Sequence, residues 1–113
     1  MSYDVCLVID TGGEHPATVT ETQSPTYNIG PMLRDALGMA MQDRKDGSPC
    51  LHGMLAADAL PIVEAALLKM ARDPARYEAM NPPNGWGTTE TAVDFLRWLA
   101  QACSEHPKAT VHV

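Results

Sequence analysis

Two cysteines and two histidines are the clearest candidate metal ligands in the sequence. Cys50 is separated from His52 by one residue, and Cys103 from His106 by two. Two thiolates and two imidazoles are a ligand set of structural zinc sites, but these pairs lack the spacing of the tight knuckles in which such ligands usually occur. Cys103 also falls on the apolar stripe of a predicted helix, where a free thiol packs like a small hydrophobic residue. The sequence therefore favours a core cysteine and predicts no metal and no cofactor, with zinc as the alternative.

A second string with chemical potential is Asp10-Thr11-Gly12, which follows two apolar residues near the start of the chain. Aspartic proteases present a catalytic carboxylate in this way, and they need two such carboxylates that share one proton. A chain with one motif would therefore act as a dimer. The alternative is a strand-ending turn in which the Asp10 carboxylate accepts hydrogen bonds from the amides of Gly12 and Gly13. The turn is favoured, because about half of the chain has helical patterns and those proteases are nearly all β.

The main candidate for a binding feature is a loop of Asn84, Gly85, Trp86 and Gly87, which directly follows two prolines. Two prolines and two glycines in seven residues exclude regular structure there. An exposed tryptophan is a favoured anchor of protein interfaces. Alternatively, Trp86 folds back over the core, and its glycine neighbours let the chain turn tightly around it. The sequence leaves both interpretations open.

Asn28 and Arg34 form a further polar candidate near the start of the first predicted helix, where Asn28 is expected to cap that helix. No phosphate-binding loop is present in the sequence, because Gly12 and Gly13 lack both the third glycine of a dinucleotide turn and the lysine of a P-loop. No catalytic triad or dyad can be assigned from residue order alone. The sequence therefore does not predict an enzyme.

Composition and charge narrow the class of protein. The chain has 113 residues and a mass of 12.2 kDa, which suits a single domain spanning residues 1–113. Lys and Arg total 8 against 14 for Asp and Glu, so the net charge of −6 argues against nucleic acid as a partner. The most apolar stretch, near residues 60–70, is interrupted by Glu64 and Lys69, which argues against membrane insertion. Three cysteines at no recognisable spacing and the absence of a leader-like start predict a cytoplasmic location.

Periodicity places these residues on a small set of elements. Alternating patterns predict strands at residues 3–10, 17–22 and 109–113, with the first two forming a hairpin and the third pairing with the first. Helical patterns cover residues 31–38, 51–70, 74–80 and 89–106, with a kink or a break expected at Pro61. Asp73 is expected to cap the third of these helices, and Thr88 or Thr89 the last, which Pro107 is expected to end. The predicted fold class is α+β: a three-stranded antiparallel sheet with three or four helices on one face, in the order β-β-α-α-α-β.

Four short motifs are spread along the chain: Ile9-Asp10-Thr11-Gly12-Gly13, Tyr27-Asn28-Ile29, Asn81-Pro82-Pro83-Asn84-Gly85-Trp86-Gly87 and His106-Pro107-Lys108-Ala109-Thr110. As a set they resemble a family of small uncharacterised proteins from actinobacteria and their phages. The resemblance extends almost from end to end, and it carries no activity, cofactor or catalytic residue. It implies a cytoplasmic accessory protein, made by a phage or carried in a prophage, that binds a host or phage protein.

The sequence and the resemblance together predict a protein-binding or adaptor module that uses the loop at residues 84–87 and the neighbouring helix surface. Three alternatives stay open: a dimeric hydrolase that uses Asp10, a metal-stabilised domain, and a minor structural protein of a virion. The sequence specifies neither the partner nor the oligomeric state.

Overall fold

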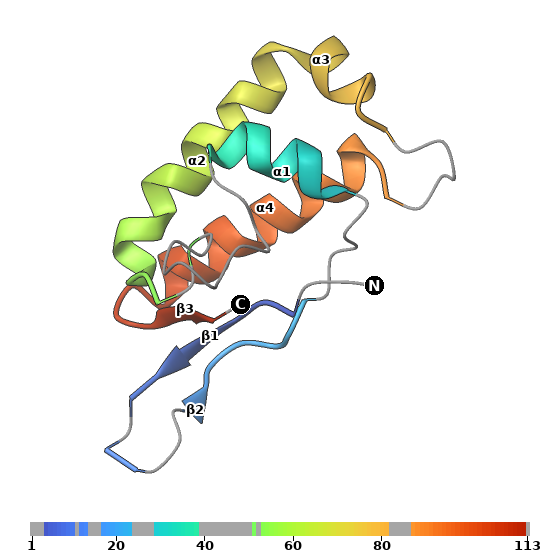
Figure 1. Cartoon of the computed structure of the whole chain (residues 1–113). Helices are drawn as coiled ribbons and strands as arrows, with labels where there is room; N and C mark the ends of the chain where they lie inside the picture. Colours follow the sequence, from blue (N-terminus) through green and yellow to red (C-terminus); the bar gives the residue numbers. More distant parts are fainter. Residues whose placement is uncertain are drawn as a thin grey trace.

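The described part of the chain forms a small antiparallel sheet and four helices (Figure 1). A computed structural model describes residues 4–10, 12–13, 17–23, 29–38, 51, 53–81 and 87–112. Its elements, in chain order, are β1 (Cys6–Ile9), β2 (Ala17–Thr18), α1 (Gly30–Leu37), α2 (Ala56–Arg72), α3 (Pro74–Glu78), α4 (Thr89–Glu105) and β3 (Thr110–His112). The predicted α+β class is confirmed.

The sheet has the strand order β2-β1-β3, with both pairings antiparallel. Val8 lies opposite Thr18 in β2 and opposite Thr110 in β3, so β1 is the central strand. The predicted hairpin and the predicted pairing of the third strand with the first are therefore confirmed. The other edge of β3 is occupied as well, because the Val111 amide donates to the Met54 carbonyl at 2.9 Å.

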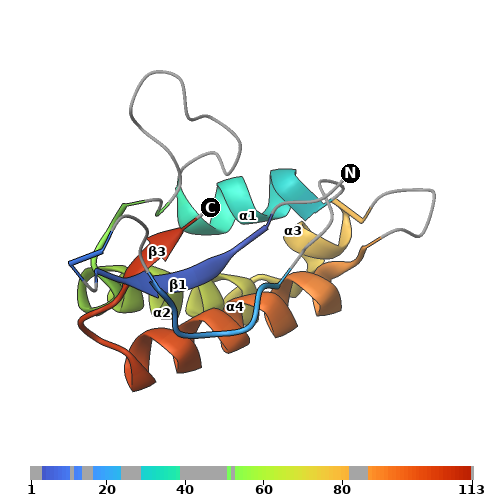
Figure 2. The ribbon, with the colours of Figure 1, turned by 90° about the horizontal axis from the view of Figure 1, so that it is seen from below.

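The helices cover one face of this sheet. Figure 2 looks at the molecule from the sheet side and shows the helices behind the strands. Val5, Leu7 and Val111 are buried on the covered face, as the two-residue period of a strand requires. α2 and α4 pack along each other and α1 packs on α2, so the core lies between the sheet and these three helices.

The long helix begins later than its periodicity predicts. Residues 51–55 continue the apolar pattern, but α2 begins only at Ala56. Leu51 is buried with a φ of 60°, and the Gly53 amide donates to the Val111 carbonyl at 2.8 Å. Pairing with β3 thus replaces the first predicted turn of helix, because the backbone of this segment makes its hydrogen bonds to a strand.

Of the kink or break predicted at Pro61, the break is wrong, because α2 continues from Ala56 to Arg72 with the proline inside it. Proline removes the hydrogen bond to the carbonyl of Ala57. Both Ala57 and Pro61 are exposed, so water can satisfy that carbonyl. The buried neighbours Ala59 and Val63 hold the helix on the core across the proline.

The predicted helix ends are partly confirmed. Thr88 caps α4, with its hydroxyl accepting from the Thr91 amide at 3.3 Å, and the helix stops before Pro107. Asp73 occupies the N-cap position of α3 as predicted, but its side chain makes no capping hydrogen bond. The N-cap position of α1 is Ile29 instead of the predicted Asn28, and no side chain caps it.

Candidate functional site

The residues of the predicted binding loop lie mostly outside the described part of the chain. Asn84, Gly85 and Trp86 belong to the segment that the structure does not describe, so both interpretations of Trp86 remain predictions. Gly87 has a φ of 93°, a left-handed conformation that favours glycine, and it leads directly into the cap of α4. The start of α4 is also held by Asn81, whose side-chain oxygen accepts from the Thr89 amide at 2.9 Å.

The second polar candidate is only half described. Asn28 lies outside the described residues. Arg34 is exposed on α1, and its carbonyl accepts the Gly38 amide that closes the helix at 2.9 Å. Whether the two side chains act together therefore stays a prediction.

The possible zinc ligands are divided in the same way. Cys50 and His52 lie outside the described residues, whereas Cys103 is fully buried in the core, as the favoured interpretation predicted. Burial raises the pKa of the Cys103 thiol to about 11, which opposes the thiolate that a metal needs. His106 lies at the C-cap of α4. No group of three or more candidate ligands gathers in the described ranges.

Asp10 adopts the geometry expected of a turn. Its carboxylate accepts a hydrogen bond from the Gly12 amide at 2.8 Å, and the residue is exposed at the end of β1. Gly12 has a φ of 80°, so the turn requires a residue that tolerates the left-handed region. Of the two hydrogen bonds that the turn interpretation predicted, the structure shows the one from Gly12 and not the one from Gly13.

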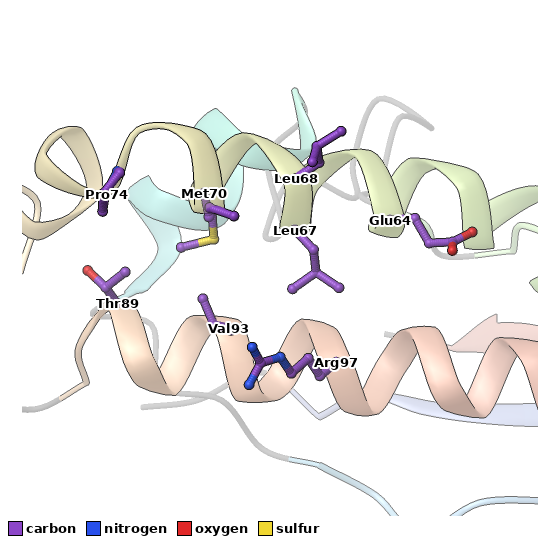
Figure 3. Close-up of a pocket in the computed structure, with 9 residues that line it drawn as sticks. Glu64, Leu67, Leu68, Met70, Pro74, Thr89, Val93 and Arg97 are labelled. Atoms are coloured by element: carbon purple, nitrogen blue, oxygen red, sulfur yellow. The ribbon is translucent and has the colours of Figure 1, made fainter.

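An open groove lies between α2 and α4, with a volume of about 560 Å³. Figure 3 shows Leu67 and Met70 pointing from α2 toward α4, and Val93 pointing back from α4. The groove is lined by these three and by Glu64, Leu68, Ala71, Pro74, Thr89 and Arg97. Its walls are therefore mainly apolar, and Leu68 at its rim is 49% exposed.

The two charged residues of this groove lie on opposite walls, Glu64 on α2 and Arg97 on α4 (Figure 3). Both are exposed. Neither side chain has an ion pair or a hydrogen bond to another residue in the described part of the chain. The groove thus offers an apolar floor, one unpaired anion and one unpaired cation.

A polar cluster joins α1 and α3. Asp35 of α1 accepts two hydrogen bonds from the Arg76 guanidinium, at 2.6 and 3.1 Å, and one from the Tyr77 hydroxyl at 2.7 Å. These bonds, those from Arg76 above all, hold the pKa of the Asp35 carboxyl below its ordinary value. Burial, and then the hydrogen bond to Asp35, raise the pKa of Tyr77 to about 12. These three hydrogen bonds fasten α3 to α1.

The Asp35 cluster makes stability depend on pH in a defined direction. A carboxyl whose pKa is lowered by folding stabilises the native state above its unfolded pKa, near 3.8, and this contribution is lost as the pH falls through and below that value. The unfolding free energy of wild type is expected to exceed that of Asp35→Asn at pH 7, and the difference is expected to shrink below about pH 4. Urea unfolding of both proteins from pH 2.5 to pH 7 measures it. A difference that does not change with pH would show that the charge of Asp35 contributes nothing.

Sequence reasoning missed the groove, although its residues carried a signal. On α2 the groove residues Glu64, Leu67, Leu68 and Ala71 are spaced as one helix face, next to the face that enters the core. The apolar stripe of this helix is therefore wider than its core contact requires. Because Val93 and Arg97 come from a helix far along the chain, only the packing of α2 on α4 shows that the two surfaces form one groove.

No family model, curated protein or solved structure matches this chain significantly. None of the described helices is long and apolar enough to cross a membrane. The fold and the groove define the chain as an α+β domain with an apolar surface between two exposed helices.

Proposed function

We propose that this chain is a protein-binding module, a small accessory or adaptor protein whose contact surface is the α2–α4 groove and the loop that leads into α4. The observation that carries the proposal is the apolar groove itself, with Leu67 and Val93 in its walls and Leu68 half exposed at its rim. Exposing apolar surface of this kind to water is unfavourable, so a partner that covers the groove is stabilised by removing that surface from water.

The geometry favours a helical partner surface. Two packed helices leave a long, straight depression between them, and an amphipathic helix places its apolar face into such a depression. The groove ends at Thr89, two residues after Gly87, so the predicted binding loop adjoins it in the chain. The resemblance to proteins of actinobacteria and their phages supports a host or phage protein as the partner.

Leu68→Glu is expected to remove binding while leaving the fold intact, since the side chain is half exposed and the change places a charge against the partner's apolar face. Tagged wild type and variant serve as bait for an actinobacterial lysate and, separately, for an untagged copy of the chain. Bound proteins are then identified by mass spectrometry. A protein retained at least about tenfold better by wild type supports the proposal.

The matched control is Leu55→Glu, because Leu55 is 42% exposed at the start of the same helix and does not line the groove. It is expected to bind like wild type. Trp86→Ala, after circular dichroism has confirmed its fold, tests whether the loop contributes. If wild type retains no more protein than Leu68→Glu in either assay, the groove is not a protein-binding surface.

A further inference from the structure

We infer that the chain has a second binding site, a pocket at the C-terminal end of α4 that takes an organic cation, either an alkylammonium or a guanidinium group. The pocket lies between α4 and the segment that follows β2. Its volume is about 280 Å³, below the range of pockets for drug-sized ligands, which suits a group the size of a side-chain end. Because this pocket shares no residue with the α2–α4 groove, it goes beyond the proposed function and does not depend on it.

Both walls of the pocket are held in place by contacts within the chain. On one side, the Val19 amide donates to the Leu7 carbonyl at 2.9 Å, and the Thr20 hydroxyl accepts from the Leu7 amide at 3.0 Å. Figure 2 shows this segment in front of α4. On the side of α4, Trp98 is partly exposed and stacks on the buried Phe95, with ring centroids 6.1 Å apart. The walls are therefore in place before a ligand binds.

The negative charge of the pocket comes from Glu105, the last residue of α4. Its Oε1 atom accepts from the Gln101 side-chain amide at 3.0 Å, which positions the carboxylate. Glu105 has no ion pair in the described part of the chain. Lys108 follows three residues later but does not line the pocket, and neither does any other lysine or arginine. The pocket thus presents a carboxylate without a counter-charge.

The end of α4 also differs in charge from the ends of the other three described helices. Basic residues lie in the last turns of α1, α2 and α3, whereas α4 has none there and ends in Glu105. A helix C-terminus carries a partial negative charge, which basic side chains stabilise and a carboxylate opposes. A cation in the pocket would offset both the helix end and the carboxylate.

Trp98 makes the pocket better suited to an organic cation than to a metal ion. The face of an indole ring attracts ammonium and guanidinium groups, and the apolar stem of such a group can pack against Trp98 and Val19. A metal ion needs several ligands, and no group of three candidate ligands gathers in the described ranges. The aromatic ring, the carboxylate and the helix end therefore favour the same class of ligand.

The test is a titration of the isotope-labelled full chain at low salt, followed by NMR, with Nα-acetyl-lysine methylamide as the probe. The indole N–H of Trp98 and the amides of Gln101 and Glu105 are expected to shift, with a dissociation constant of roughly 1–10 mM. The matched ligand is Nα-acetyl-norleucine methylamide, which has the same apolar stem without the charge. It is expected to bind at least about fivefold more weakly. Trp86→Phe assigns the indole signal of Trp98, because the sequence has two tryptophans.

Glu105→Gln keeps the shape of the side chain and removes its charge, so it is expected to weaken binding of the lysine probe by about threefold. Trp98→Leu removes the aromatic ring and is expected to weaken binding by a similar factor, about threefold. The matched control is Glu90→Gln, which removes the same charge from the first turn of α4 and is expected to bind like wild type. Glu90 and Glu105 are exposed, so both variants are expected to fold, and circular dichroism checks this.

Equal binding of the two probes overturns the inference, as does a Glu105→Gln variant that binds the lysine probe as tightly as Glu90→Gln. A chain that shows no shift up to about 50 mM lysine probe overturns it as well. A parallel titration with putrescine distinguishes the sources of such a cation. Tighter binding of this free diamine assigns the pocket to a small molecule, and tighter binding of the lysine probe assigns it to a basic side chain of another protein. Leu68→Glu is expected to bind the probe like wild type, so failure of the groove leaves this result unchanged.

Discussion

Replacing Tyr77 with alanine is expected to lower the free energy of unfolding by about 3–5 kcal/mol, the range for large aromatic residues in a core. Tyr77 is 2% exposed, and it is the buried residue of α3. A helix of five residues has almost no stability of its own, so α3 depends on this side chain and on the bonds to Asp35. Urea unfolding followed by circular dichroism measures the change.

The control for this prediction is Tyr77→Phe, which keeps the ring and removes only the hydroxyl. Its expected cost in free energy of unfolding is about 1 kcal/mol, the net value of one hydrogen bond.

At high pH the stabilities of wild type and Tyr77→Phe are expected to differ again. The raised pKa of Tyr77 keeps its hydroxyl protonated in the native state, whereas in the unfolded chain the hydroxyl ionises once the pH exceeds its ordinary pKa of 10.0. Wild type is therefore expected to lose stability between pH 10 and about 12, and Tyr77→Phe to lose less. Equal costs for Ala and Phe would contradict the anchoring role of the ring.

Leu7→Ala is expected to cost about 3–4 kcal/mol, within the range for deleting a fully buried leucine side chain. Leu7 lies in the central strand, between β2 and β3, and its side chain is completely buried against the helices. The residual cavity would lie at the contact between the sheet and the helices, where no exposed side chain can fill it. Since domains of this size are stable by only about 5–15 kcal/mol, the melting temperature is expected to fall by many degrees.

Ile9→Ala provides an internal comparison for Leu7→Ala. Ile9 lies two residues further along the same strand and on the same face, but it is 40% exposed. Its truncation is expected to cost about 1 kcal/mol or less, because less apolar surface returns to water. If both substitutions lower the free energy of unfolding equally, the result contradicts the deeper burial of Leu7 than of Ile9 in β1.

Much of the fold could be predicted from the sequence because its signals are local. The alternation in the three strands, the cap at Thr88 and the stop before Pro107 all depend on residues within one or two turns of each other. The same reasoning failed at residues 51–55, and at Pro61 it allowed a break that does not occur, for one common reason. In both places tertiary contacts decided the outcome: hydrogen bonds to β3 in the first, and a buried helix face on either side of an exposed proline in the second.

The candidate site was less accessible to sequence reasoning. The predicted site residues are rare or chemically reactive types, such as Trp86 and the cysteines, because those types stand out in a sequence. The groove consists of common residues, such as Leu68 and Val93, which in a sequence are indistinguishable from core. Only their exposure in the folded chain separates them from the buried residues of the same helices.

By itself, the sequence determined the α+β class, the hairpin with its third strand, the start of α4 to within one residue, its end before Pro107, and the core position of Cys103. It could do so because propensities, caps and periodicity act over a few residues. Only the tertiary structure decided that α2 and α4 lie side by side with Glu64 and Arg97 on opposite walls, and that Asp35 meets Tyr77. Asp35 and Tyr77 are 42 positions apart, and such partners are selected by the packing of whole helices, which no local pattern encodes.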